Sequence, residues 1–291
     1  ASISAGSYTD GYVGVAPGAE LLVVKLKQSK QYLRDFFLIK DDVPAFEESD
    51  IMLALRFLED YAIRLGKPLI IIFGLGSANG SRTGASPLAE MMENLTKKPN
   101  ISVITCMGNE ANNKCHYKGA VMSALVPDVM EINVDGTGKG FTMEIWADSL
   151  DILSVSIESP SGEYVPRIPA RMGASMEYTF LYEGSTVTVD YQITENVAGM
   201  EVIFVRLKTP VEGTWKFYIY SLTNIKGSYN AWLPLKQFSG QDIYFLKSDP
   251  DTTLTVPAAA DGVISVGAYN HYTGAAYYES GRGYSADGRI K

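Results

Sequence analysis

Cysteine and histidine are scarce in this sequence. Its 291 residues include only two cysteines, Cys106 and Cys115, and two histidines, His116 and His271. Two cysteines cannot build the disulfide framework of a small secreted domain, and their spacing from the histidines fits no zinc-ligand pattern. We therefore expect a fold stabilised by its hydrophobic core, with no metal and no other cofactor.

Positive charge and long apolar runs are also missing. The chain has 25 Lys and Arg against 33 Asp and Glu, a net charge of -8, so no basic surface would gather the phosphates of a nucleic acid. The longest apolar run, Leu69 to Leu75, is far shorter than the ~18 residues that span a bilayer, and the first residues lack the features of a signal peptide. The sequence thus predicts no nucleic-acid partner and no membrane partner.

The residues that are present are typical of a globular protein. Hydrophobic residues make up 46% and charged residues 20% of the chain, which excludes a disordered chain, a coiled coil and a collagen. The length suggests one large domain or two, and we expect two. Ala1 follows no methionine and Lys291 ends on no recognisable stop, so we expect a piece of something longer.

The first part of the chain has the pattern of alternating strands and helices. Leu21 to Leu26 reads as a short strand, and the continuous apolar run Leu69 to Phe73 is typical of a strand covered on both faces. Ile101 to Thr105 reads as the next buried strand, and Gly262 to Gly267 as a later one. The order predicts an α/β fold, a doubly wound parallel sheet with right-handed crossovers.

Two helices are expected between these strands. Apolar residues three and four positions apart predict one buried helix face over Ile51 to Leu65. Ser49 is the expected N-cap of this helix, and Gly66 the expected left-handed residue after its last turn. A second helix is expected to begin at Ser86-Pro87 and to stop by Pro99.

After about Lys118 the apolar residues alternate with a period of two. This pattern, with turn signals such as Ser161-Gly162 and Glu212-Gly213, predicts an antiparallel jelly roll or sandwich of about 130 residues. We therefore expect residues 1–117 to begin an α/β core, 118–247 to form an inserted β domain, and 248–291 to return to the core. The expected strand residues are Phe141, Met143 and Ile145; Leu153, Val155 and Ile157; Met176, Tyr178 and Phe180; Val187, Val189 and Tyr191; and Trp215, Phe217 and Ile219.

Glycine-containing segments follow two of the predicted parallel strands. Gly74-Leu75-Gly76 comes directly after Leu69 to Phe73, and Gly108-Asn109-Glu110 follows Ile101 to Thr105. In an open parallel sheet, ligands bind outside the carboxyl ends of the strands, and glycine lets the main chain lie close to a ligand. On position alone each segment is more often a plain strand-exit turn, because Gly and Asn are common there, but the two together on neighbouring strands are more informative.

Four segments in order resemble one enzyme family. They are Gly14 to Leu26, Met107 to Glu110, Thr255 to Ala258 with Val263 to Ala268, and Ser280 to Lys291. They resemble the strand-entry motif, the oxyanion loop, a later strand and the approach to the nucleophile in the subtilisin-like serine proteases (subtilases, peptidase family S8). The inserted β domain resembles the arrangement in bacterial subtilases of the spore-germination type. The resemblance implies a subtilisin-like α/β fold and a serine endopeptidase that hydrolyses peptide bonds in protein or peptide substrates.

The resemblance also implies roles for particular residues. Asn109 matches the amide that donates a hydrogen bond to the oxyanion of the tetrahedral intermediate. Gly74, Leu75 and Gly76 match the segment that pairs with the substrate backbone and walls the specificity pocket, and Gly108 belongs to the facing substrate-binding loop. Gly74 stands where the family usually has serine, a departure that leaves the wall of the pocket in place.

The catalytic triad of that family falls outside these residues. The resemblance places the histidine and aspartate before Ala1 and the nucleophilic serine beyond Lys291. We therefore expect an internal fragment, inactive by itself, that carries oxyanion and substrate-binding elements of an active parent. The parent's propeptide is a further expected partner, and the family favours an extracellular, cell-envelope or spore-associated setting. The alternative is a non-catalytic parent, either a pseudoprotease scaffold or a binding module built on the jelly roll.

Three other groups of residues could be given a functional role, but each has a simpler structural interpretation. Two histidines with a serine and an aspartate could be drawn as a local triad, although loop histidines are usually polar surface groups. The two cysteines have no base placed beside them and are interpreted as inert thiols. The tryptophans could line a sugar-binding site, although such residues more often pack in the core. The residues in question are His116, His271, Ser285 and Asp287; Cys106 and Cys115; and Trp146, Trp215 and Trp232.

Overall fold

The computed structural model describes residues 13–147, 151–193, 200–223 and 225–291. Contacts between residues group the chain into two units. The first comprises residues 1–28 with 46–68, and the second comprises residues 29–45 with 69–291.

The regular structure described in the first unit is helix α3, Glu48–Leu65. Leu55 and Ala62 on the predicted stripe are buried, and Gly66 ends the helix in the left-handed conformation (φ 62°), as expected. The predicted N-cap is wrong, because the helix starts after Glu47 and Ser49 lies within its first turn. The predicted strand over Leu21 to Leu26 is also wrong, since these residues have no regular structure.

A small parallel sheet begins the second unit after its short helix α2, Gln31–Phe36. Strands β1 (Leu69–Phe73), β2 (Ile101–Cys106) and β14 (Ile264–Val266) pair in the order β1-β2-β14. Helix α4, Pro87–Thr96, connects β1 to β2 and packs against β2. Its start is as predicted, because the Ser86 side chain accepts a hydrogen bond from the Ala89 amide (3.2 Å) and Pro87 occupies the first turn.

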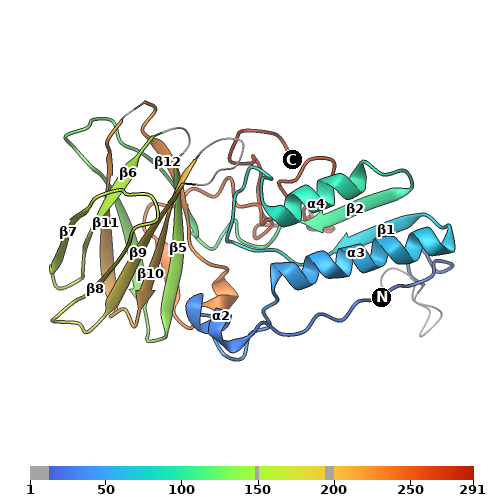
Figure 1. The fold of residues 1–291 in the computed structure, drawn as a ribbon, viewed down its shortest axis with the longest axis horizontal. Helices are drawn as coiled ribbons and strands as arrows, with labels where there is room; N and C mark the ends of the chain where they lie inside the picture. The colour runs from blue at the N-terminus through green and yellow to red at the C-terminus, as the bar shows by residue number, and fades with distance from the viewer. Residues whose placement is uncertain (1–12, 148–150, 194–199, 224) are drawn as a thin grey trace. The chain divides into compact units, whose positions relative to one another are not determined.

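Two antiparallel sheets form most of the second unit and pack face to face as a sandwich (Figure 1). One contains β3 (His116–Ala120), β5 (Gly140–Ala147), β8 (Ser175–Thr179), β9 (Thr186–Ile193), β10 (Glu201–Lys208) and β12 (Ser228–Trp232) in the order β3-β12-β5-β10-β9-β8. The other contains β4 (Asp128–Asp135), β6 (Leu153–Glu158), β7 (Tyr164–Ile168), β11 (Gly213–Ser221) and β13 (Asp242–Phe245) in the order β13-β4-β11-β6-β7. A one-turn 3-10 helix, Lys236–Phe238, precedes β13.

The two sheets share one hydrophobic core. Alternate side chains of β11 point into it, among them Trp215 and Phe217, and both are fully buried. The Trp215 ring meets the edge of Phe180 at 5.0 Å between centroids, and its indole N–H donates to the Val211 carbonyl (3.1 Å). Burial of apolar faces between the sheets therefore explains the period-two pattern of this part of the sequence.

The predicted fold class, a doubly wound α/β sheet, is wrong. The structure is mostly β, with 34% of residues in strands and 14% in helices. A doubly wound fold needs helices on both faces of an extended parallel sheet, but the described residues contain only three parallel strands, one of them three residues long. The antiparallel strands outweigh them because they fill most of the chain between His116 and Phe245.

The predicted division into residues 1–117, 118–247 and 248–291 stays a prediction. The grouping by contacts keeps the sandwich and the parallel sheet in one unit. No helix within the described residues has the length and apolar character needed to cross a membrane.

Candidate functional site

The two glycine-containing segments leave the parallel sheet at the same edge. Strands β1 and β2 run parallel with Phe73 opposite Thr105, so residues 74–76 and 107–110 follow from neighbouring strand ends. Gly74, Leu75 and Asn109 are exposed there, while Gly76 and Gly108 are half-buried. The structure therefore brings together all five residues that the sequence analysis singled out.

Thr255 fills the space between these segments. A Cβ added to Gly76 would lie 2.4 Å from the Thr255 Oγ1, and one added to Gly108 would lie 2.5 Å from its Cγ2. The Thr255 amide donates to the Met107 carbonyl (3.1 Å) and its hydroxyl to the Cys106 carbonyl (3.3 Å). Gly108 also has a φ of 91°, which disfavours any other residue. Glycine is required at both positions because Thr255 packs directly against the main chain.

Asn109 presents a free side-chain amide. Within the described residues this amide makes no hydrogen bond, although the Asn109 carbonyl accepts one from the Asn113 side chain (3.2 Å). The same Asn113 nitrogen donates to Glu110 Oε2 (2.9 Å), which fixes the turn after Asn109. Burial raises the pKa of the Glu110 carboxyl. The Asn113 side chain therefore fixes the backbone of the turn, and Asn109 itself is exposed.

The loop that continues from Gly76 is held by the sandwich. Glu144 of β5 is buried and accepts hydrogen bonds from the Gly80 amide and from the Trp146 indole, both at 2.9 Å. Arg82 is also buried, with its guanidinium 4.5 Å from the ring centre of Trp232. Burial lowers the pKa of Arg82 to about 10 and raises that of Glu144. These contacts fix the path of the chain between the candidate site and α4.

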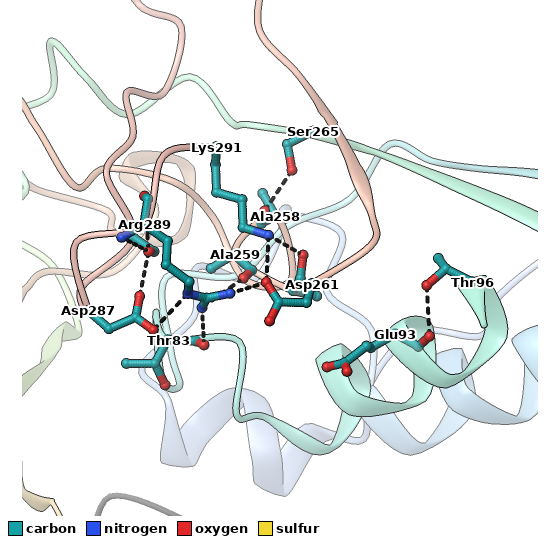
Figure 2. Close-up of polar contacts among 12 residues, drawn as sticks. Thr83, Glu93, Thr96, Ala258, Ala259, Asp261, Ser265, Asp287, Arg289 and Lys291 are labelled. Atoms are coloured by element: carbon teal, nitrogen blue, oxygen red, sulfur yellow. Dashed lines mark hydrogen bonds and ion pairs between the residues drawn. The ribbon is translucent and has the colours of Figure 1, made fainter.

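A set of ionic contacts fixes the last described residues against the same loop (Figure 2). The Arg289 guanidinium donates to Asp287 Oδ2 (2.7 Å), to Asp261 and to the Thr83 carbonyl. Lys291 donates to the Ala260 carbonyl (2.7 Å) and also pairs with Asp261 (3.2 Å). These contacts hold Arg289 and Lys291 against Thr83, in the loop that leads from Gly76 to α4, and against residues 260–261.

The residues proposed for a local triad are not brought together. His116 is buried, bonded to the Asn230 side chain (2.9 Å) and near the Asp249 carbonyl (3.2 Å), and burial lowers its pKa. His271 lies in an exposed loop. Ser285 donates to Asp287 Oδ1 (2.5 Å), and no hydrogen bond joins it to a histidine within the described part of the chain. His116 and Ser285 have structural partners instead.

The cysteines and tryptophans also have structural roles. Both thiols are free, and burial raises the pKa of Cys115 to about 12, far from that of a reactive thiolate. Cys106 lies beside the candidate site, with its sulfur 3.8 Å from the Leu75 carbonyl oxygen. All three tryptophans are buried, so none presents a ring for a sugar to stack on; they are Trp146, Trp215 and Trp232.

Thr255 organises the site, and its role could not be predicted from the sequence. No local signal relates Thr255 to Gly76 or Gly108, which lie far away in the chain. The described residues contain no group of three His, Cys, Asp or Glu side chains placed to hold a metal ion.

Comparison with known proteins gives one informative similarity. No protein-family model and no curated protein matches this chain. Five chains of solved structure match, including the Clostridium perfringens CspB protease, with a TM-score of 0.75 and 24% sequence identity. The match covers 87% of this chain and 54% of that one, so the chain spans about half the length of the CspB protease. At this identity the similarity shows a shared fold, and that fold is one used by a protease.

Proposed function

We propose that this chain is the peptide-binding and oxyanion-binding part of a subtilisin-like serine endopeptidase. The observation that carries the proposal is the meeting of Gly74–Gly76 with Gly108 and Asn109 around Thr255 at one sheet edge. Gly74 and Leu75 are exposed, and Gly74 has no side chain that an approaching extended peptide would meet. The fold shared with the CspB protease supports this assignment.

Asn109 would act on the charge that develops during the reaction. Attack on a peptide carbonyl places negative charge on its oxygen, and a donor already aimed at that oxygen stabilises the transition state more than the ground state. The exposed, unbonded amide of Asn109 suits that role, since it needs no other hydrogen bond to be broken first. The nucleophile and its base would come from elsewhere in the parent protein, as the family resemblance implies.

The test is a pair of substitutions in the full-length parent protein. Asn109→Leu keeps the approximate bulk and removes the donor, so kcat is expected to fall ~10² to 10³-fold with little change in KM, which is the effect of losing the equivalent donor in subtilisin itself. Asn112→Leu changes another exposed asparagine of the same turn and is the matched control. Normal kcat in the Asn109→Leu parent would refute the oxyanion role. A parent without any turnover would instead favour the pseudoprotease scaffold.

A further inference from the structure

The outer face of the five-stranded sheet carries three tyrosines on strands β7 and β11. Strand β6 lies between these two, with Ser154 opposite Tyr220 and Ser156 opposite Tyr218. The other sheet holds the loop of the candidate site through Glu144, so this face lies on the opposite side of the sandwich (Figure 1). Its outward side chains, here called the tyrosine face, are Ser154, Ser156, Glu158, Tyr164, Arg167, Lys216, Tyr218 and Tyr220.

Small residues on β6 let larger side chains lie over this strand. Ser154 and Ser156 are fully buried, although both belong to the outer face of the sheet. The Tyr164 hydroxyl donates to the Ser156 hydroxyl (2.7 Å), and the Arg167 Nε donates to the Ser154 hydroxyl (2.6 Å). Ser156 in turn donates to the Tyr220 hydroxyl (3.4 Å). Side chains from both neighbouring strands therefore cover β6 and make the tyrosine face continuous.

The rings of the tyrosine face are ordered and still accessible. Tyr164 leaves 44% of its surface exposed, and Tyr218 and Tyr220 are half-buried. The ring centres of Tyr164 and Tyr218 are 6.0 Å apart, and the Arg167 guanidinium lies 4.6 Å from the centre of the Tyr220 ring. Because these contacts already fix the rings, little conformational freedom is lost when a ligand binds to them.

The charges on this face balance, while hydrogen-bonding groups remain available. Glu158 accepts from the Tyr218 hydroxyl (2.5 Å) and from Lys216 (2.9 Å), and these hydrogen bonds lower the pKa of its carboxyl. Lys216 also lies opposite Glu131 of β4, so these two carboxylates balance Lys216 and Arg167. Within the part of the chain that the structure describes, the terminal nitrogens of Arg167 donate no hydrogen bond. They are free to donate to a ligand.

We propose that the tyrosine face binds a neutral glycan whose β-linked sugar rings lie flat on it. The apolar face of a sugar ring can stack on an aromatic ring, and sugar hydroxyls can accept from Arg167 and donate to Glu158. The balanced charges complement a ligand that has none, although the whole chain has a net charge of -8. This proposal does not depend on the proposed function of the candidate site. It gives the sandwich a separate role, which is to hold the protein on a polysaccharide.

The experiment uses the 291-residue chain and three neutral oligosaccharides. Chitohexaose and cellohexaose are β-linked and extended, whereas the α-linked maltohexaose coils. The two β-linked chains are expected to shift the NMR signals of the Tyr164, Tyr218 and Tyr220 rings. Maltohexaose should bind roughly three- to tenfold more weakly, because fewer of its rings can stack at once.

Substitutions at two positions test whether the tyrosine face is the binding surface. Tyr164→Ser removes a ring and should weaken chitohexaose binding roughly three- to tenfold, whereas Tyr164→Phe keeps the ring and should bind within about twofold of the unsubstituted chain. Arg167→Ala should also weaken binding. Tyr272→Ser is the matched control, because this tyrosine lies outside the sandwich and leaves 87% of its surface exposed. Circular dichroism establishes that each variant is folded.

Several results would overturn the proposal. It is wrong if neither β-linked chain shifts the three ring signals, or if Tyr164→Ser and Arg167→Ala bind chitohexaose as tightly as the unsubstituted chain. Equal affinity for maltohexaose would show that the face does not select flat chains. If the ring signals change with protein concentration alone, the occupant is a second copy of this chain.

Discussion

A methyl group on Gly108 should disturb the candidate site in a predictable way. In Gly108→Ala the new Cβ would lie 2.5 Å from the Thr255 Cγ2, well inside van der Waals contact. Thr255 is buried and bonded on both its amide and its hydroxyl, so it cannot move away freely. Overpacking of this kind costs about 1 to 3 kcal/mol. The φ of 91° adds about 1 to 3 kcal/mol of backbone strain for a residue with a Cβ.

The steric part of this cost can be isolated by a second substitution. Thr255→Ser removes Cγ2 and keeps the hydroxyl, and by itself should cost about 1 kcal/mol for one buried methyl group. In the double variant the close contact disappears while the backbone strain remains. The double variant should therefore be about 1 to 3 kcal/mol more stable than the sum of the two single changes predicts.

Urea unfolding followed by circular dichroism gives the four free energies of unfolding. Gly74→Ser is the control, because nothing lies within 4 Å of a Cβ at that position and its cost should stay within about 0.5 kcal/mol. If the costs of Gly108→Ala and Thr255→Ser add within about 0.5 kcal/mol, the two residues are not in the contact described and the reasoning is refuted.

Three further predictions concern the rest of the chain. Burial raises the pKa of Glu201 to about 7, so between pH 4.5 and about 7 the native state holds a proton that the unfolded state, with the ordinary pKa of 4.5, has lost. The free energy of unfolding should therefore fall as pH rises through this range. Compared with the unsubstituted chain, Glu201→Gln should be more stable at about pH 8 than at about pH 5, and a pH-independent difference in unfolding free energy would contradict this. Residues 118–247 expressed alone should unfold cooperatively, because both sheets share one core, and an insoluble or molten product would count against an independent domain. The 291-residue chain should release no peptide from casein above background, because the family resemblance places the nucleophile and its base outside it, and turnover that survives repurification and depends on one of its residues would disprove this.

Local signals in the sequence were sufficient for some elements. The apolar run Leu69 to Phe73 forms β1, and Ser86-Pro87 starts α4, because burial and capping act within a few residues. Leu21 to Leu26 shows the limit of such signals. Its composition suits a strand, but a strand exists only when a neighbour completes its hydrogen bonds, and no strand pairs with it among the described residues. The fold class was wrong for a related reason, since a few parallel strands were given more weight than the longer antiparallel part.

The candidate site was predictable in outline and not in its packing. Gly76 and Gly108 stand out only as a pair, because they follow neighbouring parallel strands and the strand order predicts that both lie at one edge of the sheet. Thr255 could not be assigned a role, because its contact with both glycines depends on how the chain returns after the sandwich.

The route of the chain through the sandwich also has a consequence for the order of folding. Ile264 of β14 pairs with Ile104 of β2, a contact that closes a loop of about 160 residues in the unfolded chain. The folded sandwich joins His116 to Asp249 by a 2.9 Å hydrogen bond, which leaves about 27 residues to close and lowers the entropic cost by about 1.5 kcal/mol. Since β14 has only three residues to offset that cost, its pairing should follow formation of the sandwich. A substitution that slows the sandwich would then delay assembly of the sheet edge that carries Asn109.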